Sequence, residues 1–307
     1  MNLRLLPTVS AIAIFAYLWS LVADAEPQGS AWNGHYLDNG THYLLYEAPK
    51  IRRQDYLALA NISSNPAINA LESLDYLPTR IVNGKRIRCT RARYQCALHY
   101  QGSFICGCVI LSHRWILTAH HCIIGSPEDY SVRAGSVQQR RGGQLRRVQK
   151  IVAHGGYNDF TMNNDIAMMK LKKPLKFNRC CRRVRLPRRR RRRRLPRCCL
   201  ASGWGLASEN AQNVQRYLRG VIVCKVRRRR CVRSYRKAGI KITKHMICYA
   251  RKNRDTCSGD SGGPLVHKNI LIGITSFGIG CARKRYSGVY TDAGDYVKWI
   301  KMVMRKH

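Results

Sequence analysis

The sequence predicts an all-β fold that ends in one helix. From Ile81 onward, short apolar runs alternate with turns, and five of these runs are examples of predicted strands. They span residues 104–111, 115–119, 166–171, 221–223 and 270–277. Many short strands of this kind are typical of a β-barrel or a β-sandwich.

The last stretch of the chain differs, because its apolar residues recur at helical spacing. These residues are Tyr296, Trp299, Ile300, Val303 and Met304. Asp295 stands directly before them and is a candidate N-cap. We expect this helix to pack against the strands rather than to bind a ligand.

The N-terminus has the three parts of an export signal. Arg4 is followed by a largely apolar stretch over residues 9–22, and Ala-Asp-Ala at 23–25 fits the pattern of a cleavage site. A membrane anchor is the alternative, but a span needs about 20 apolar residues, which is longer than this stretch. We therefore expect residues 1–25 to be a signal peptide and the protein to be secreted and extracellular.

Residues 26–80 have no sustained helical or strand period and are mildly acidic. They contain none of the 14 cysteines, so no disulfide can tie this region to the rest of the chain. Asn39 and Asn61 each begin an acceptor triplet for N-glycosylation. We interpret the region as a propeptide with two candidate glycosylation sites, followed by a domain over residues 81–307.

The charge distribution is uneven. The chain carries 56 Lys and Arg against 16 Asp and Glu, a formal net charge of +40, and almost all basic residues follow residue 80. Such a charge repels itself and attracts polyanions, for example a sulfated glycan. The many cysteines fit an oxidising compartment, in which disulfides persist.

Two arginine runs occur at residues 188–194 and 227–230. Like charges in a row repel one another and remain solvated, so we expect both runs to be loops. Two readings stay open at this point: solvated loops without a dedicated partner, or loops that bind a polyanion.

Three segments supply a histidine, an aspartate and a serine in that order. Residues 118–122 read Thr-Ala-His-His-Cys, residues 164–167 read Asn-Asp-Ile-Ala, and residues 255–264 read Asp-Thr-Cys-Ser-Gly-Asp-Ser-Gly-Gly-Pro. A serine hydroxyl needs a base to become nucleophilic, and an aspartate can orient a histidine that acts as this base. The glycines around Ser261 permit a sharp turn that presents N–H groups to a developing oxyanion.

These segments resemble the chymotrypsin-like serine protease family, in its trypsin-like subgroup. Gly-Asp-Ser-Gly-Gly-Pro at 259–264 is the most specific signature, and Ile-Val-Asn-Gly at 81–84 looks like the activated N-terminus. Ser-Gly-Trp-Gly at 202–205 and Gly-Val-Tyr-Thr at 288–291 look like further landmarks. Some details resemble insect digestive or reproductive trypsins. The resemblance covers residues 81 to about 302 and implies two packed six-stranded antiparallel β-barrels with the active site between them.

The resemblance also assigns catalytic roles. His121 is the base rather than His120, because the catalytic histidine of the family directly precedes a cysteine. Asp165 orients this histidine, and Ser261 is the nucleophile. The N–H groups of Gly259 and Ser261 form the oxyanion hole.

A pocket for Arg or Lys follows from the same resemblance. Asp255 occupies the floor position, and a carboxylate there favours a basic side chain before the cut. Gly278 and Gly288 match the pocket walls, and Ser276 lies in the strand that binds substrate backbone. Phe277 replaces the usual tryptophan, which leaves the preference of neighbouring subsites open.

The resemblance implies activation by cleavage after Arg80. In the family, Asp260 pairs with the amine that cleavage creates at Ile81. A buried ammonium–carboxylate pair is stable only when both charges exist, so the uncut precursor is expected to be inactive. The activator would be an upstream trypsin-like protease or the enzyme itself.

The disulfides that the resemblance implies are Cys106–Cys122, Cys231–Cys248 and Cys257–Cys281. Eight cysteines stay unassigned: Cys89, Cys96, Cys108, Cys180, Cys181, Cys198, Cys199 and Cys224. Zinc held by the adjacent pairs at 180–181 and 198–199 is an alternative, but adjacent cysteines rarely bind one metal. Residues 131–158 contain no acid that could bind calcium. We expect no metal and no other cofactor.

The sequence thus predicts a secreted serine endopeptidase, made as a zymogen, whose substrates are proteins or peptides with Arg or Lys before the cut. A catalytically silent homologue is one alternative, and the intact His121, Asp165 and Ser261 argue against it. A polyanion-binding protein that acts through its arginine-rich loops is another.

Overall fold

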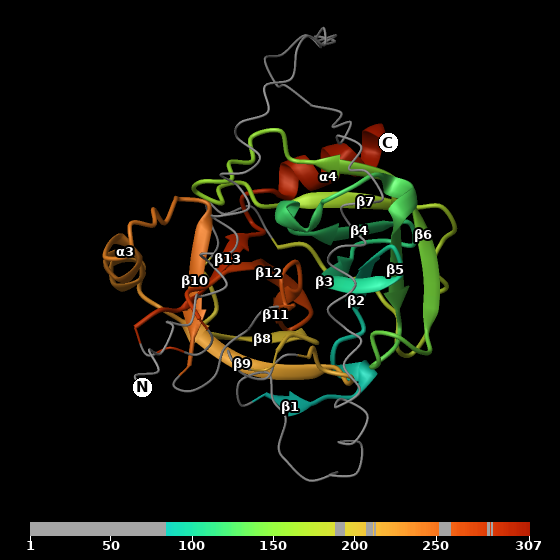
Figure 1. Cartoon of the computed structure of the whole chain (residues 1–307), viewed down its shortest axis with the longest axis horizontal. Helices are drawn as coiled ribbons and strands as arrows, with labels where there is room; N and C mark the ends of the chain where they lie inside the picture. The colour runs from blue at the N-terminus through green and yellow to red at the C-terminus, as the bar shows by residue number, and fades with distance from the viewer. Residues whose placement is uncertain are drawn as a thin grey trace, which may run out of the picture. The chain divides into compact units, whose positions relative to one another are not determined.

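The computed structural model describes residues 84–187, 194–206, 211, 213–251, 259–280, 283 and 285–307 (Figure 1). The predicted signal peptide, propeptide and glycosylation sites lie outside these ranges, as does most of the arginine run at 188–194. The described ranges contain His121, Asp165 and Ser261, but not residues 255–258 of the segment that carries Ser261.

Six antiparallel strands close the first barrel in the order β2-β3-β4-β7-β6-β5. The strands are β2 (Gln95–Tyr100), β3 (Ser103–Ile110), β4 (Trp115–Thr118), β5 (Tyr130–Ala134), β6 (Gln144–Ala153) and β7 (Ala167–Leu171). A two-residue turn, Gln101 and Gly102, joins β2 to β3 with φ of 47° and 83°. Positive φ at both turn residues matches the right-handed twist of the strands that the turn connects.

The second barrel contains β8 (Cys198–Gly203), β9 (Arg219–Lys225), β10 (Met246–Ala250), β11 (Pro264–His267), β12 (Ile270–Phe277) and β13 (Gly288–Asp292). These strands pair in the order β9-β10-β13-β12-β11-β8, and the pairing of β8 with β9 closes the ring. A short strand, β1 (Lys85–Arg86), adds to β9 from outside. The predicted double six-stranded barrel is confirmed (Figure 1).

The two barrels share one buried apolar cluster. It includes Leu98 and Ile116 of the first barrel together with Val266 and Ile274 of the second. A polar contact between the barrels is also buried, because the Ser202 hydroxyl donates to Gln95 Oε1 at 2.8 Å. This contact satisfies two side chains that would lose water on burial.

The predicted C-terminal helix is confirmed as α4 (Val297–Lys306), which buries Val297, Ile300 and Val303. The predicted cap is wrong. Tyr296 occupies the N-cap position, and its side chain makes no capping bond. The carboxylate of Asp295 instead accepts a hydrogen bond from His245 Nδ1 at 3.0 Å, so a tertiary partner replaces the local one.

The expectation of a loop at the second arginine run is also wrong, because Arg228 begins helix α3 (Arg228–Arg236). Cys231 and Tyr235 lie one helical turn apart and are both buried, and Cys231 is bonded to Cys248 of β10. The guanidinium of Arg228 donates to the carbonyls of Ile242 and Thr243 at 3.1 and 2.8 Å. Burial of one face thus outweighs the repulsion between neighbouring arginines on the other.

Five disulfides join described cysteines: Cys89–Cys180, Cys96–Cys108, Cys106–Cys122, Cys198–Cys224 and Cys231–Cys248. Two of them are pairs that the family resemblance implies, and the third implied pair, Cys257–Cys281, lies outside the described residues. The alternative zinc site is wrong, because Cys180 and Cys198 form disulfides with Cys89 and Cys224. Cys181 is a buried free thiol, and burial raises its pKa to about 11.

Candidate active site

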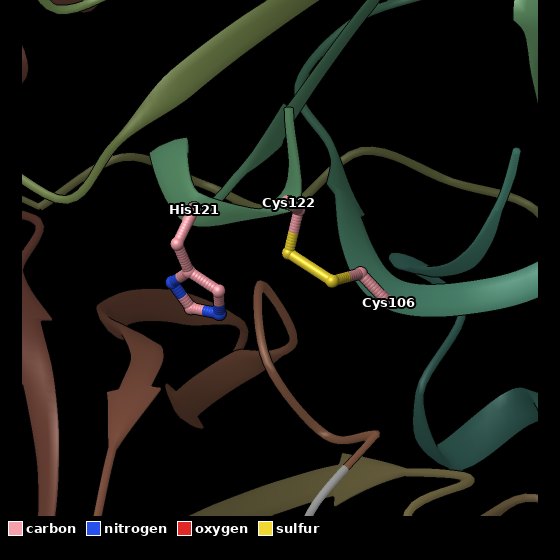
Figure 2. Close-up of side chains that lie close together, drawn as sticks. All are labelled: Cys106, His121 and Cys122. Atoms are coloured by element: carbon pink, nitrogen blue, oxygen red, sulfur yellow. A yellow bond between two sulfur atoms is a disulfide. The ribbon is translucent and has the colours of Figure 1, made fainter. Parts of the chain in front are cut away.

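His121 lies in a short 3₁₀ helix, η3 (His120–Cys122), directly after β4. The Cys106–Cys122 disulfide ties the end of this helix to β3 (Figure 2). The imidazole is 25% exposed, so it is held by its neighbours and still open to a ligand.

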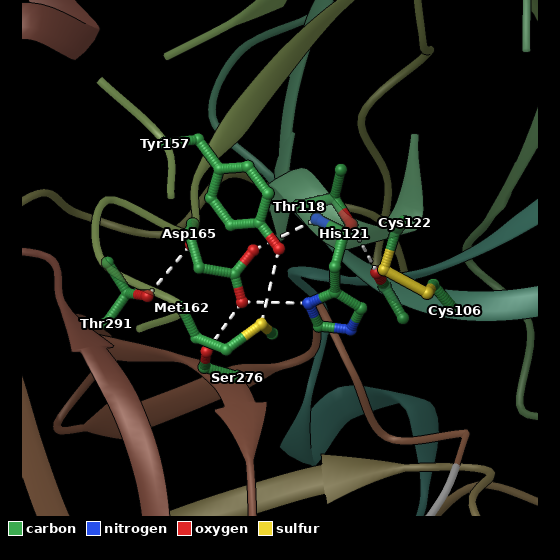
Figure 3. A network of polar contacts seen from close by, with 10 residues as sticks. Cys106, Thr118, His121, Cys122, Tyr157, Met162, Asp165, Ser276 and Thr291 are labelled. Atoms are coloured by element: carbon green, nitrogen blue, oxygen red, sulfur yellow. Dashed lines mark hydrogen bonds and ion pairs between the residues drawn. A yellow bond between two sulfur atoms is a disulfide. The ribbon is translucent and has the colours of Figure 1, made fainter. Parts of the chain in front are cut away.

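Asp165 is fully buried just before β7, and its carboxylate accepts three hydrogen bonds (Figure 3). Its Oδ2 accepts from His121 Nδ1 at 2.8 Å and from the Ser276 hydroxyl at 2.5 Å, and its Oδ1 accepts from the His121 backbone N–H at 3.0 Å. A carboxylate only accepts, so Nδ1 of His121 must carry the proton. In neutral His121, Nε2 then has a free lone pair and can act as a base.

The environment of Asp165 favours its charged form. Burial alone would raise the pKa of this carboxyl, but the nearby charge of His121 and the hydrogen bonds from His121 and Ser276 outweigh it, so that the pKa lies below its ordinary value. An ionised Asp165 can orient the imidazole and stabilise its cation.

Two supports of Asp165 were not assigned from the sequence. Ser276, near the end of β12, was expected to lie in the strand that binds substrate backbone, and its hydroxyl donates a hydrogen bond to Asp165. Thr291, in β13, donates from its hydroxyl to the Asp165 carbonyl at 2.8 Å. Thr291 was quoted within the Gly-Val-Tyr-Thr landmark, so the motif marked the position without revealing the contact. Both hydroxyls come from the second barrel and hold a residue of the first.

Among the described residues, the neighbouring histidine, His120, makes no hydrogen bond to Asp165. Its ring stacks on Tyr157 instead. The two ring centroids lie 3.9 Å apart with an interplanar angle of 16°. Burial lowers the pKa of His120, which favours the neutral ring. The geometry therefore selects His121 as the partner of Asp165, as the cysteine that follows it indicates.

Ser261 lies in the turn that precedes β11, and hydrogen bonds fix this turn to both barrels. Its carbonyl accepts from the Gly107 N–H of β3 at 2.8 Å, and the next residue, Gly262, donates to Thr275 O of β12 at 2.8 Å. The carbonyl of Gly107 accepts from the Thr118 hydroxyl at 3.0 Å, at the end of β4. Gly107 therefore links the serine turn to the segment that carries His121.

Glycine is required at two positions of this arrangement. Gly262 has a φ of +73°, and a Cβ there would lie 2.2 Å from Thr118 Oγ1. A Cβ on Gly107 would lie 2.9 Å from the Cα of Gly263. Any side chain at either position would push the serine turn away from β3 and β4, because contacts this short are repulsive.

Asp260 is fully buried, and its Oδ1 accepts a hydrogen bond from Gly205 N–H at 2.8 Å. A Cβ on Gly203 would lie 2.1 Å from the same oxygen, so only glycine permits this approach. The two candidate activation residues Arg80 and Ile81 lie outside the described residues.

The candidate specificity pocket is described in part. Asp255 lies outside the described residues. Gly278 follows β12 and Gly288 begins β13, and these strands pair with Phe277 opposite Val289. The two glycines expected to form the walls thus lie at the same end of one antiparallel ladder. Gly259 has a φ of +87°, a conformation that glycine adopts without strain.

One group of metal-ligand residue types occurs here. Ligand atoms of Cys106, His121 and Cys122 lie within 4.8 Å of one another, but the two sulfurs form a disulfide (Figure 2). A disulfide offers no thiolate, which is the form of cysteine that binds a metal.

No helix within the described ranges is both apolar and long enough to span a membrane.

A buried aspartate that is hydrogen-bonded to a partly exposed histidine, at the junction of two six-stranded barrels, is the architecture of a chymotrypsin-like serine protease. A sequence profile of the trypsin family matches residues 81–300. Trypsin 5G1 of Aedes aegypti is 36% identical over 241 residues, which are 78% of this chain and 88% of that protein. The vitellin-degrading protease of Bombyx mori is 36% identical over 224 residues, 72% of this chain and 84% of that protein.

A solved structure is also similar. Mouse neuropsin, a serine protease expressed in the limbic system, superposes with a TM-score of 0.66 at 32% identity, over 72% of this chain and 99% of its own. The chain belongs to the trypsin family of serine proteases.

Proposed function

We propose that the protein is an endopeptidase that cleaves peptide bonds after Arg or Lys. The observation that carries the proposal is the hydrogen bond of 2.8 Å between His121 Nδ1 and buried Asp165. In addition, Gly107 of β3 bonds both to Ser261 and to Thr118, which lies in the segment that carries His121. This arrangement argues against a catalytically silent homologue, because such a protein would not need His121 to be held in the tautomer whose Nε2 can act as a base.

In the proposed reaction, Ser261 Oγ attacks the carbonyl carbon of the substrate while His121 Nε2 takes the hydroxyl proton. The N–H groups of Gly259 and Ser261 stabilise the oxyanion of the tetrahedral intermediate. His121 then returns the proton to the leaving amine, which breaks the C–N bond and leaves an acyl-enzyme. Water, deprotonated by His121, hydrolyses the ester and restores the Ser261 hydroxyl.

The preference for Arg or Lys rests on Asp255. A carboxylate at the floor of a partly desolvated pocket binds a guanidinium or ammonium group through charge-assisted hydrogen bonds. Gly278 and Gly288 support this reading, because their strands pair at the same end of β12 and β13. A side chain at either position would narrow the entrance.

We propose that cleavage after Arg80 activates the precursor. Asp260 supports this mechanism, because it is fully buried and lies between Gly259 and Ser261 in the chain. The ammonium group of cut Ile81 would neutralise this carboxylate, whereas the uncut amide cannot. An upstream trypsin-like protease, or another copy of the active enzyme, would make the cut.

Secretion is part of the proposal. Residues 1–25 would direct export, residues 26–80 would form the propeptide, and Asn39 and Asn61 would accept glycans. Five disulfides among the described residues support an oxidising destination, since reducing compartments do not maintain them.

One measurement tests enzyme class, specificity and activation together. The purified precursor is assayed with Arg, Lys, Phe and Ala ester substrates, before and after cleavage between Arg80 and Ile81. We expect Arg and Lys esters alone to be hydrolysed rapidly, and only after cleavage. Equal activity of the uncut chain would contradict the activation mechanism, and a preference for Phe or Ala would contradict the pocket assignment.

A further inference from the structure

A basic crevice lies outside the candidate active site, at a second place where the two barrels contribute to one surface. Its cavity volume is about 1250 Å³. Six cations line it, and they are Arg91, Arg93, Arg182, Arg183, Arg185 and Lys268. No Asp or Glu is among the described residues that line this basic crevice. None of the residues discussed for catalysis, specificity or activation lines it either.

Backbone contacts fix the position of these cations. The 182–185 segment donates from Arg182 N to Arg93 O at 3.0 Å and from Arg185 N to Asn269 O at 3.0 Å. The Arg185 carbonyl accepts from Leu271 N at 2.9 Å, and the Cys89–Cys180 disulfide joins the two arginine-bearing segments of the first barrel. The cations are therefore presented by anchored backbone.

The side chains that make the crevice basic are accessible. Arg91, Arg182, Arg183, Arg185 and Lys268 are exposed. Within the part of the chain that the structure describes, none of them forms an ion pair with a carboxylate. Several cations held together without acids repel one another, and a bound anion would relieve this repulsion.

The crevice also has an apolar part, which we call its floor because it is less exposed than five of the six cations. Leu200, Ile222 and Val266 of the second barrel form this floor. At one side, His113 stacks on Phe177 with ring centroids 3.8 Å apart. A cavity larger than the usual range of about 300–1,000 Å³ for small-molecule sites, with an apolar floor and a cationic rim, fits a ligand made of several linked units. A sulfated sugar chain is complementary to such a cavity, because its rings have an apolar face and its sulfate groups are anions.

We propose that the basic crevice binds a segment of a sulfated glycan, with sulfate groups on the Arg91, Arg182 and Arg183 side and sugar rings over the apolar floor. The five disulfides favour a glycan over a nucleic acid, because they indicate an oxidising, extracytoplasmic compartment. The site is independent of His121, Asp165 and Ser261, so the proposal stands or falls separately from peptidase activity.

The first experiment measures binding of a heparin-derived hexasaccharide to the full-length uncut chain by titration calorimetry, at an ionic strength of about 0.15 M. The test variant is Arg91→Ser/Arg182→Ser/Arg183→Ser, whose side chains are exposed, so that the anchoring backbone bonds remain. The matched control removes three exposed cations from α3 and its end, as Arg233→Ser/Arg236→Ser/Lys237→Ser.

We expect the test variant to lose affinity by on the order of a hundredfold and the control by about threefold or less. Desulfated hexasaccharide should bind weakly to all three proteins. Equal losses in the test variant and the control would overturn the proposal, because binding would then follow net charge alone. A single-stranded oligonucleotide of equal charge that bound more tightly and lost as much in the test variant would also overturn it.

A second experiment needs no variant and so does not depend on folding of the substituted chains. Exposed arginines of the wild-type chain are modified with phenylglyoxal, with and without the hexasaccharide, and mapped by mass spectrometry. We expect the ligand to protect Arg91, Arg182 and Arg183 while Arg233 and Arg236 react as before. Protection of the α3 arginines with no protection in the crevice would contradict the proposal.

Discussion

The two barrels together form two surfaces, the candidate active site and the basic crevice, in which charged groups are arranged in opposite ways. In the candidate active site, one buried carboxylate, Asp165, is surrounded by donors from both barrels. In the basic crevice, six cations share an open surface without a described acid. A buried hydrogen-bonded group depends on every partner, whereas exposed charges contribute additively and are screened by salt. Single substitutions should therefore be severe in the first surface and graded in the second.

The largest expected effect is that of Ser261→Ala in the activated enzyme. Removal of the hydroxyl leaves His121 with nothing to activate, and kcat for an Arg ester should fall by about a millionfold. The melting temperature serves as the control and should stay close to that of the wild type. Undiminished turnover by a homogeneous sample would exclude Ser261 as the nucleophile.

Asp165→Asn should lower kcat by about ten-thousandfold, because an amide no longer fixes the proton on His121 Nδ1. Asp295→Asn is the matched control, since Asp295 also accepts from a histidine Nδ1 at 3.0 Å but outside the site. Its kcat should remain near the wild-type value. Similar losses in the two variants would mean that the His121–Asp165 contact is structural only.

Asp255→Ser should change specificity more than chemistry. The buried cation of the substrate would lose its carboxylate, so the ratio of kcat/KM for Arg over Phe esters should fall by at least about a thousandfold. Asp159→Ser removes an exposed carboxylate and should leave this ratio intact. An unchanged ratio in Asp255→Ser would mean that another residue recognises the basic side chain.

Ser276→Ala should have a smaller effect, because it removes one of the three hydrogen bonds to the Asp165 carboxylate. We expect kcat to fall by roughly tenfold to a hundredfold. The lower pH limit of activity should move to higher pH, because the pKa of Asp165 rises when this donor is lost. Ser202→Ala removes another buried hydroxyl, bonded to Gln95, and should affect melting but not the pH profile. Identical pH profiles in wild type and Ser276→Ala would contradict a positioning role.

The smallest expected effect on catalysis is that of substitutions in the basic crevice. The variant Arg91→Ser/Arg182→Ser/Arg183→Ser should hydrolyse a small Arg ester with kcat and KM within about twofold of the wild type, because distant exposed charges are screened. A change in kcat as large as that of Ser276→Ala would show that the two surfaces are coupled.

Local sequence was sufficient to locate five of the strands, and it named the catalytic candidates. The apolar runs predicted at 104–111, 115–119 and 270–277 fall on β3, β4 and β12. Their apolar side chains must leave water whatever the neighbouring elements are. Two local inferences failed where a partner elsewhere in the chain decided the outcome. Arg228 donates to the carbonyls of Ile242 and Thr243, and Asp295 accepts from His245.

What the sequence by itself determined is the position of five strands and of the last helix, and it named His121, Asp165 and Ser261 as catalytic candidates, since both depend on residue type and short-range spacing. The tertiary structure alone decided the pairing of Cys89 with Cys180, the support of Asp165 by Thr291, and the meeting of Arg91, Arg182 and Lys268. These residues are brought together only when the strands pair and close into barrels. Contacts at such separations are set by register and ring closure, which no local pattern encodes.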